Sequence, residues 1–358
     1  MFGNKKDGPE PAGFKQTYRK LVMKRLSFIV ICMVLCIAVA VYSATIGTYD
    51  ISSADVYRII WNHITGAKQP DATMAHIVIN LRLPEIITAL VCGFALGVCG
   101  TAMQSMLKNP LADPYTMGIS SGAGFGAALA IILGLEIFSG GGVVANAFVF
   151  SLIPALAILF LSKFKKATPT MMILCGIALM YMFNAMTQLF MLLADPDDMS
   201  AVYTWMVGAV TGVDYSELLT ILVVTAAGSL IIQYMSNQLN IMGIGDESAQ
   251  TLGVNVERKR LIALIVVSLV AATVVSFTGI IGFVGLVAPH IVRTVIGADN
   301  KFLVPASAVF GALLLLVSDI VAKTIVAPVI LPVGVITSCI GGPLFLYLIL
   351  RNNKEVWS

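Results

Sequence analysis

The sequence is poor in charged residues. Only 11% of the 358 residues are Asp, Glu, Lys or Arg, against about 25% in ordinary soluble domains. Hydrophobic residues make up 58% of the chain, and apolar runs of about twenty residues, enough to cross a hydrocarbon core of roughly 30 Å, recur along it. These proportions exclude an ordinary soluble domain. They predict an all-α, polytopic membrane protein.

Patterns that would support chemistry by this chain alone are also missing. The six cysteines lie in apolar segments without zinc-ligand or redox spacing, and the three histidines are scattered. The sequence has no phosphate loop of the Gly-x-x-x-x-Gly-Lys-Ser type, so any ATP chemistry must come from a partner. It also has no basic stripe with interleaved aromatic residues, which excludes nucleic-acid binding. We therefore expect a non-enzymatic chain that binds no metal or cofactor, so that any ATP and Mg²⁺ would be held by other subunits.

What the sequence does contain is a series of apolar segments that predicts ten membrane spans. The expected spans are 26–46, 85–106, 115–134, 144–162, 170–193, 216–235, 260–279, 281–297, 304–323 and 333–350. With the N-terminus inside, the inner segments carry 18 of the 22 Lys and Arg residues and the outer segments carry 4. Lys and Arg concentrate in cytoplasmic segments, so both termini are expected in the cytoplasm of a multi-pass plasma-membrane protein.

The domain organisation follows from these spans. We expect a basic cytoplasmic tail over 1–25, one transmembrane domain over 26–350 and a short cytoplasmic tail over 351–358.

A sharp interruption separates the second and third spans. The stretch "MQSMLKNPLADPYTMGISSGAGFG" begins at residue 103, and its Pro110 and Pro114 break the helix. Glycines then recur every fourth residue, and the preceding span has small residues at the same spacing. These small residues are Gly118, Gly122 and Gly126, and Ala89, Gly93, Gly97 and Thr101. Such faces let helix backbones approach closely in lipid, so we expect a dense helical bundle.

The loop over 242–260 is the most informative polar stretch. Asp246 is expected to cap a short helix, Glu247 to favour its positive end, and Gly253 to end it in the left-handed conformation. Three basic residues, 258–260, follow the expected helix. The pattern indicates a cytoplasmic docking surface, although an arbitrary connecting loop remains an alternative.

Two carboxylates raise a different possibility. "GIGD" at 243–246 matches a short pattern of intramembrane aspartyl proteases, which need two carboxylates sharing a proton. The only other candidate is Asp319, which we place near the opposite side of the membrane. Asp319 is instead expected to pair with Lys323, one helical turn away.

The fifth span carries a polar face. Tyr181, Asn184 and Gln188 lie on it, with Thr187 adjacent. Polar groups within a span face protein or a water-filled path. Lining of a translocation pathway and bonding between helices are equally compatible with this face.

The chain closely resembles the permease subunits of type II ABC importers, which take up ferric siderophores, haem and cobalamin. The resemblance covers nearly everything after residue 45. It rests on "LRLPE", "GTAMQSMLKNPLADPYTMGISSGAG", "GIIGFVGLVAPHIVR" and "LPVGVITSCIGGPLFLYLILR". It implies a homodimer of ten-helix subunits, two cytoplasmic ATPases and an extracytoplasmic solute-binding protein. A ferric siderophore is the expected substrate, with haem and cobalamin as alternatives.

The resemblance also assigns residues. It implies a cytoplasmic gate, an ATPase-coupling helix with an exposed small face, and basic residues that dock the binding protein. The gate residues are Asn109, Leu111, Thr168 and Thr170; the coupling residues are Asp246, Glu247, Ala249, Leu252 and Gly253; the docking residues are Arg82 and Lys323. Glu85 departs from the family pattern, which commonly has a second arginine there.

Overall fold

The computed structural model describes residues 12–137 and 142–351, and these residues form helices without any strand. Ten helices correspond one for one to the expected spans. They are α1 (Ala12–Ser43), α4 (Leu83–Leu107), α5 (Ile119–Leu133), α6 (Gly142–Leu161), α7 (Pro169–Leu193), α9 (Tyr215–Tyr234), α12 (Val256–Thr278), α13 (Val284–Ile296), α14 (Asn300–Thr324) and α15 (Val333–Arg351). The all-helical membrane class is therefore confirmed.

The number of crossings stays a prediction. Among the described residues, seven helices are long and apolar enough to cross a membrane. The helices Ile119–Leu133, Val284–Ile296 and Val333–Tyr347 are apolar but shorter.

Several further helices were not expected from the apolar pattern. They are α2 (Ser53–Thr65), α3 (Ala72–His76), the π-helical turn Ile77–Arg82, the 3-10 turn Tyr115–Met117, α8 (Pro196–Val207) and α10 (Ser236–Ile244). Helix α11 (Asp246–Thr251) is the short helix expected in the 242–260 loop. The first helix also begins at Ala12, so residues 12–25 of the expected tail continue α1. Residues 1–11 and 352–358 of the two expected tails lie outside the described residues.

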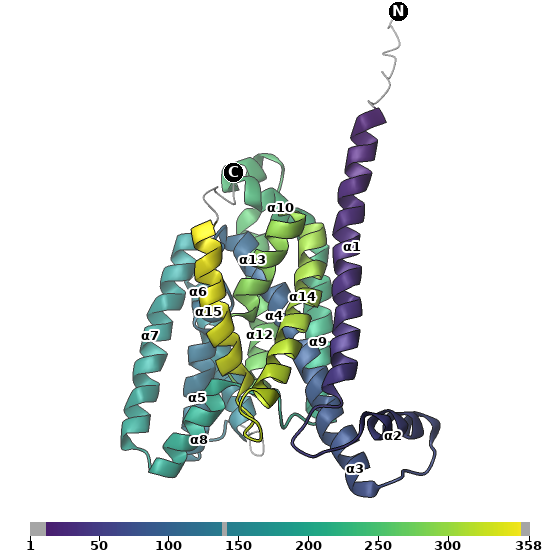
Figure 1. The fold of residues 1–358 in the computed structure, drawn as a ribbon. Helices are drawn as coiled ribbons and strands as arrows, with labels where there is room; N and C mark the ends of the chain where they lie inside the picture. Colours follow the sequence, from purple (N-terminus) through teal and green to yellow (C-terminus); the bar gives the residue numbers. More distant parts are fainter. Residues whose placement is uncertain (1–11, 138–141, 352–358) are drawn as a thin grey trace, which may run out of the picture.

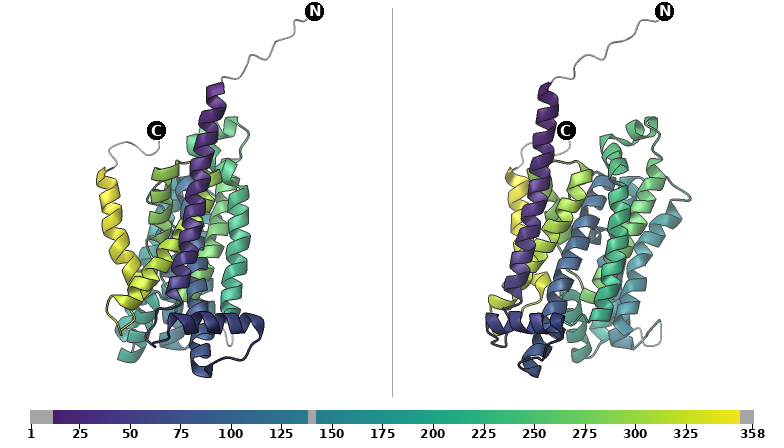
Figure 2. Two further views of the ribbon diagram at one scale, coloured as in Figure 1. Left: turned by 45° about the vertical axis from the view of Figure 1, so that its right-hand side comes forward. Right: turned by 90° about the vertical axis from the view of Figure 1, so that its right-hand side faces the viewer.

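The long helices run side by side as one bundle (Figure 1). Helix α1 begins, and α15 ends, at the end of the bundle where α10 lies; we call this the α10 end. Helices α2 and α3 lie at the other end, the α2 end (Figures 1 and 2). Helices α1 and α7 stand on opposite sides, with α4 between them.

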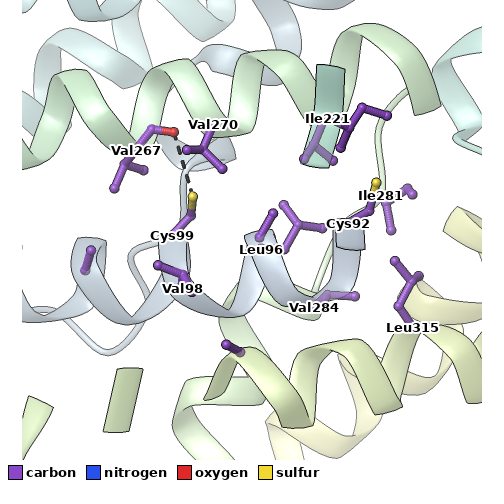
Figure 3. Packing of buried hydrophobic residues seen from close by; sticks show 14 of the residues in the cluster. Cys92, Leu96, Val98, Cys99, Ile221, Val267, Val270, Ile281, Val284 and Leu315 are labelled. Carbon is purple, nitrogen blue, oxygen red and sulfur yellow. Dashed lines mark hydrogen bonds between the residues drawn. The ribbon is translucent and has the colours of Figure 1, made fainter. Parts of the chain in front are cut away.

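The core is built around α4. Cys92, Leu96 and Cys99 point from α4 toward the neighbouring helices, where Val267 and other apolar side chains surround them (Figure 3). The Cys99 thiol lies 3.8 Å from the Val267 carbonyl oxygen. Cysteine is therefore used here as a small buried side chain, as in Cys32 and Cys36, whereas Cys175 is half-buried and Cys339 is exposed.

Small residues let the central helices touch through their backbones, as expected. A Cβ atom at Gly97 of α4 would collide with the Ser307 carbonyl oxygen of α14. At Gly122 of α5 it would lie 2.5 Å from the Phe150 carbonyl oxygen of α6. Backbone contacts this close hold helices together where lipid removes the hydrophobic driving force.

Candidate functional site

The short helix α11 forms at the position predicted for coupling. Gly253 follows it with φ of 82°, so the predicted left-handed stop is confirmed. Glu247 and Leu252 are exposed, and Leu252 keeps 64% of its surface accessible. These side chains give the α10 end a surface on which another protein can dock.

Two predictions about α11 are wrong. Ala249 is fully buried, because α11 lies against α10 and α12 and turns its small face inward. Asp246 does not cap the helix, since Gly245 occupies the N-cap position. The Asp246 carboxylate instead binds two cations from other elements.

These cations are Lys108 and Arg260. The Lys108 ammonium lies 2.6 Å from Asp246 Oδ1, and Arg260 Nη2 donates to Oδ1 at 2.9 Å and Oδ2 at 3.0 Å. Lys108 ends α4, and Arg260 lies in the first turns of α12. One carboxylate thus joins α11 to both helices.

Arg260 makes further bonds, to the end of α4 and to the loop before α7, beside the two predicted gate segments. Its Nε donates to the Met106 carbonyl oxygen at 3.1 Å, and its Nη1 donates to the Ala167 carbonyl oxygen at 2.9 Å. The side chain is only 2% exposed, so the predicted surface role for this arginine is wrong. The Ala167 N–H also donates to Glu257 at 3.1 Å. We call Lys108, Asp246 and Arg260 the junction.

The electrostatics of the junction favour the charged state of its carboxylate. Partial burial raises the pKa of Asp246, but hydrogen bonds from Lys108 and Arg260 outweigh it, so the pKa lies below its ordinary value. The carboxylate is therefore ionised at neutral pH. The ion pairs persist across the physiological range.

The turn after α4 is built by its own residues. Lys108 adopts the left-handed conformation with φ of 51°, which is uncommon for a residue with a side chain. Asn109 Oδ1 accepts a hydrogen bond of 2.9 Å from the Leu111 N–H, the pattern of an Asx turn. Leu111 is 47% exposed. Of the predicted gate residues in this turn, Asn109 stabilises the backbone, and the Leu111 side chain projects from the turn into the open.

The facing loop precedes α7. Thr168 caps α7 by accepting from the Met171 N–H at 3.2 Å, while Thr170 is exposed. Both threonines line an open cavity of about 780 Å³ beside Phe160. Arg260 binds the carbonyl oxygen of Ala167, the residue before Thr168, and that of Met106 near Asn109. It therefore connects both predicted gate segments.

At the α2 end the predicted docking cations are buried. Arg82 is 5% exposed and donates to the carbonyl oxygens of Ala44, at 3.0 Å, and Tyr49, at 2.6 Å. Lys323 is 7% exposed and binds Asp319 at 2.7 Å, as predicted, and Glu85 at 2.9 Å. The docking prediction assumed exposed cations, and that assumption is wrong.

The polar face of α7 remains open in the single chain. Tyr181 is 68% exposed, Gln188 is exposed and Asn184 is half-buried, whereas the adjacent Thr187 is buried and donates to the Phe183 carbonyl oxygen. A separate cavity of about 650 Å³ lies between α5, α8, α13 and α15, and Asp113 is among its lining residues. This cavity and the open face are the two candidates for a pathway.

The geometry excludes an aspartyl protease. Asp246 lies at the α10 end, and Asp319 lies 19 residues along α14 from Asn300, whose backbone N–H binds Asn240 of α10 at that same end. At 1.5 Å per residue the two carboxylates are separated by roughly 28 Å. Each is also occupied by its own cations, so they cannot share a proton.

Sequence reasoning missed the junction. Asp246 and Lys108 are 138 positions apart, and no local pattern joins them. Two signals were present in the sequence. Lys108 precedes the helix-breaking Asn-Pro, and Arg260 directly precedes the apolar run of α12. Neither position in the sequence indicates which side chain the lysine or the arginine binds.

Comparison with known proteins agrees with this architecture. The hemin transport system permease of Yersinia pestis is 37% identical over 90% of this chain and 95% of its own length. An Fe(3+)-citrate import system permease of Bacillus subtilis is 35% identical over 95% and 99%. The cobalamin import system permease of Halobacterium salinarum is 38% identical over 78% and 74%.

A solved structure is similar as well. It is described as an inward-facing conformation of a metal-chelate type ABC transporter, with a TM-score of 0.80 and 28% identity over 91% of this chain and 99% of that one. Residues 34–351 match the FecCD transport family. The chain belongs to the FecCD transport family, a family of ABC transporter permease subunits.

Proposed function

We propose that the chain is the membrane subunit of an ATP-driven importer that takes up a ferric siderophore or a similar metal chelate. The family and the similarity to a metal-chelate transporter support this role. Relatives named for hemin and cobalamin make these compounds the alternative substrates. ATP and Mg²⁺ are bound by two separate ATPase subunits, and a solute-binding protein delivers the substrate.

The observation that carries the mechanism is the junction. An ATPase seated on Glu247 and Leu252 displaces α11, and Asp246 transmits this displacement to Lys108 and Arg260. Arg260 in turn holds the carbonyl groups of Met106 and Ala167. Movement of α11 therefore shifts both gate segments together, with Asn109 and Leu111 on one side and Thr168 and Thr170 on the other.

The α7 face supports a homodimer. Tyr181, Asn184 and Gln188 would be costly if they faced hydrocarbon. A second copy against this side of the bundle covers them and makes them part of a shared pathway. The predicted coupling surface lies at the end where α1 begins and α15 ends (Figure 1), which supports cytoplasmic termini in the plasma membrane.

The test is reconstitution in proteoliposomes. The chain is assembled with its ATPase, the binding protein is added on the opposite side, and uptake of a ferric hydroxamate, hemin and cobalamin is measured with and without ATP. We expect ATP-dependent uptake of the ferric chelate and a dimeric permease carrying two ATPase subunits. Uptake that proceeds without ATPase, or by a monomeric permease, would contradict the proposal.

A further inference from the structure

An apolar groove opens on the side of the bundle away from α7. Its walls are α1 and α9, and its floor is formed by α4 and α14. The right-hand view of Figure 2 faces this side. The groove encloses about 710 Å³, and Met33, Phe94, Ala226 and Ala308 are among the residues that line it. Its walls are helices expected to face lipid, so hydrocarbon chains can enter it from the side.

A row of polar side chains runs down one wall of this groove. Thr225, Ser229 and Gln233 are spaced by four residues on α9, and all three line the groove. Thr225 Oγ1, Ser229 Oγ and Gln233 Oε1 have no hydrogen-bond partner within the described part of the chain. At 1.5 Å per residue the row extends about 12 Å inward from Gln233. All three oxygen atoms are buried beneath neighbouring side chains, so the open surface of the groove is apolar and suits a hydrocarbon chain.

The mouth of the groove lies at the α10 end and is positively charged. Gln233 Nε2 donates to the Lys301 carbonyl oxygen at 3.1 Å, which places Lys301 at this mouth. Lys301 is exposed and makes no ion pair with any described residue. The acidic residue nearby, Asp299, is already bound by Arg25 at 2.9 Å and by Asn240 at 2.8 Å. The mouth therefore has a cation available for an anion.

We propose that this groove is a binding site for a phospholipid with an anionic headgroup. The headgroup phosphate lies beside Lys301, and one acyl chain lies along the floor between α1 and α9. Basic pockets between membrane helices bind anionic headgroups in this way.

Charge favours a phospholipid over a helix of another membrane protein. A helix that filled the groove would bring apolar side chains to the mouth and leave Lys301 without a counter-ion. An anionic phospholipid supplies both the negative charge for Lys301 and the hydrocarbon for the apolar groove. The site is separate from the junction and from the open face of α7, so it does not depend on the proposed substrate.

The experiment measures lipid binding to the purified permease with its ATPase subunits. Native mass spectrometry counts retained phospholipids, and delipidated protein is titrated with phosphatidylglycerol or phosphatidylcholine while its melting temperature is followed. Ala226→Phe fills the groove. Ala227→Phe, at the next position of α9, does not line the groove and is the matched control. Ala226→Leu repeats the test with a smaller side chain, in case phenylalanine disturbs α9.

We expect the wild type and Ala227→Phe to retain phosphatidylglycerol and to gain thermal stability from it, and both Ala226 variants to lose at least half of each effect. Lys301→Gln should weaken phosphatidylglycerol binding about fivefold, the equivalent of about 1 kcal/mol for one cation at the membrane surface. Lys163→Gln, an exposed lysine outside the groove, should leave binding unchanged. Equal binding of the two lipids would overturn the proposal. Retention by the Ala226 variants equal to that of Ala227→Phe, or a membrane polypeptide found in the groove, would also overturn it.

Discussion

If the proposed mechanism holds, replacing Asp246 by asparagine should weaken the transmission of movement from α11 to the predicted gate segments. Lys108 and Arg260 both donate to Asp246 Oδ1, at 2.6 and 2.9 Å, so these two cations lie at most about 5.5 Å apart. Two unit charges at this distance repel by about 3 kcal/mol when the effective dielectric constant is about 20. The carboxylate that separates them is 35% exposed, so water screens part of this repulsion, and we expect a cost of about 1–2 kcal/mol.

The assay compares transport per ATP hydrolysed, in proteoliposomes, with the melting temperature of the same preparation. Asp246→Asn should lower transport per ATP by about tenfold, the equivalent of about 1.4 kcal/mol. Lys108→Met in the same chain should restore part of it, because one of the two repelling cations is gone. Asp197→Asn is the matched control, with the same charge change on an exposed residue of α8, away from the junction. If Asp246→Asn behaves like Asp197→Asn in both measurements, the junction does not transmit movement.

Three further predictions concern other positions, and a fourth concerns the pH dependence of Asp246. Leu252→Arg should reduce ATPase co-purification while the melting temperature stays constant, because this side chain is exposed; unchanged co-purification would place the docking surface elsewhere. Lys323→Met should destabilise the chain by about 3–5 kcal/mol in thermal unfolding, because the buried carboxylates of Glu85 and Asp319 lose their counter-ion. Lys323→Arg should retain most of the stability. Gly97→Leu should lower the melting temperature through a collision with α14 that costs about 1–3 kcal/mol, unlike Gly243→Ala, whose added Cβ meets nothing. The lowered pKa of Asp246 means that its stabilising contribution is complete at neutral pH and is lost only below about pH 4, so a loss of ATPase binding centred near pH 6 would contradict its role.

Hydropathy predicted the long apolar helices, because twenty consecutive apolar residues have few alternatives to a helix in a bilayer. It could not predict α2 or α8, which are short and carry polar residues on one face. The helix faces that pack closely could also be predicted, because small residues recur every fourth position on a helix that approaches another in lipid.

The burial of individual residues could not be predicted from the sequence in the same way. Ala249 lies in the polar segment "DESAQT", and its burial depends on where α11 meets α10 and α12. Arg82 and Lys323 have the sign expected of docking residues, but carbonyl groups of Ala44 and Tyr49 and the carboxylate of Glu85 enclose them. These partners come from distant segments, so charge and spacing alone could not identify them.

The single guanidinium of Arg260 has a thermodynamic consequence. It is bonded at once to the end of α4, to the loop before α7 and to α11, so a shift in any one of these segments changes the free energy of the other two. Coupling of this kind is reciprocal. If an ATPase bound to α11 changes the affinity of the pathway for its substrate, then substrate bound against the gate segments changes the affinity of α11 for the ATPase by the same factor.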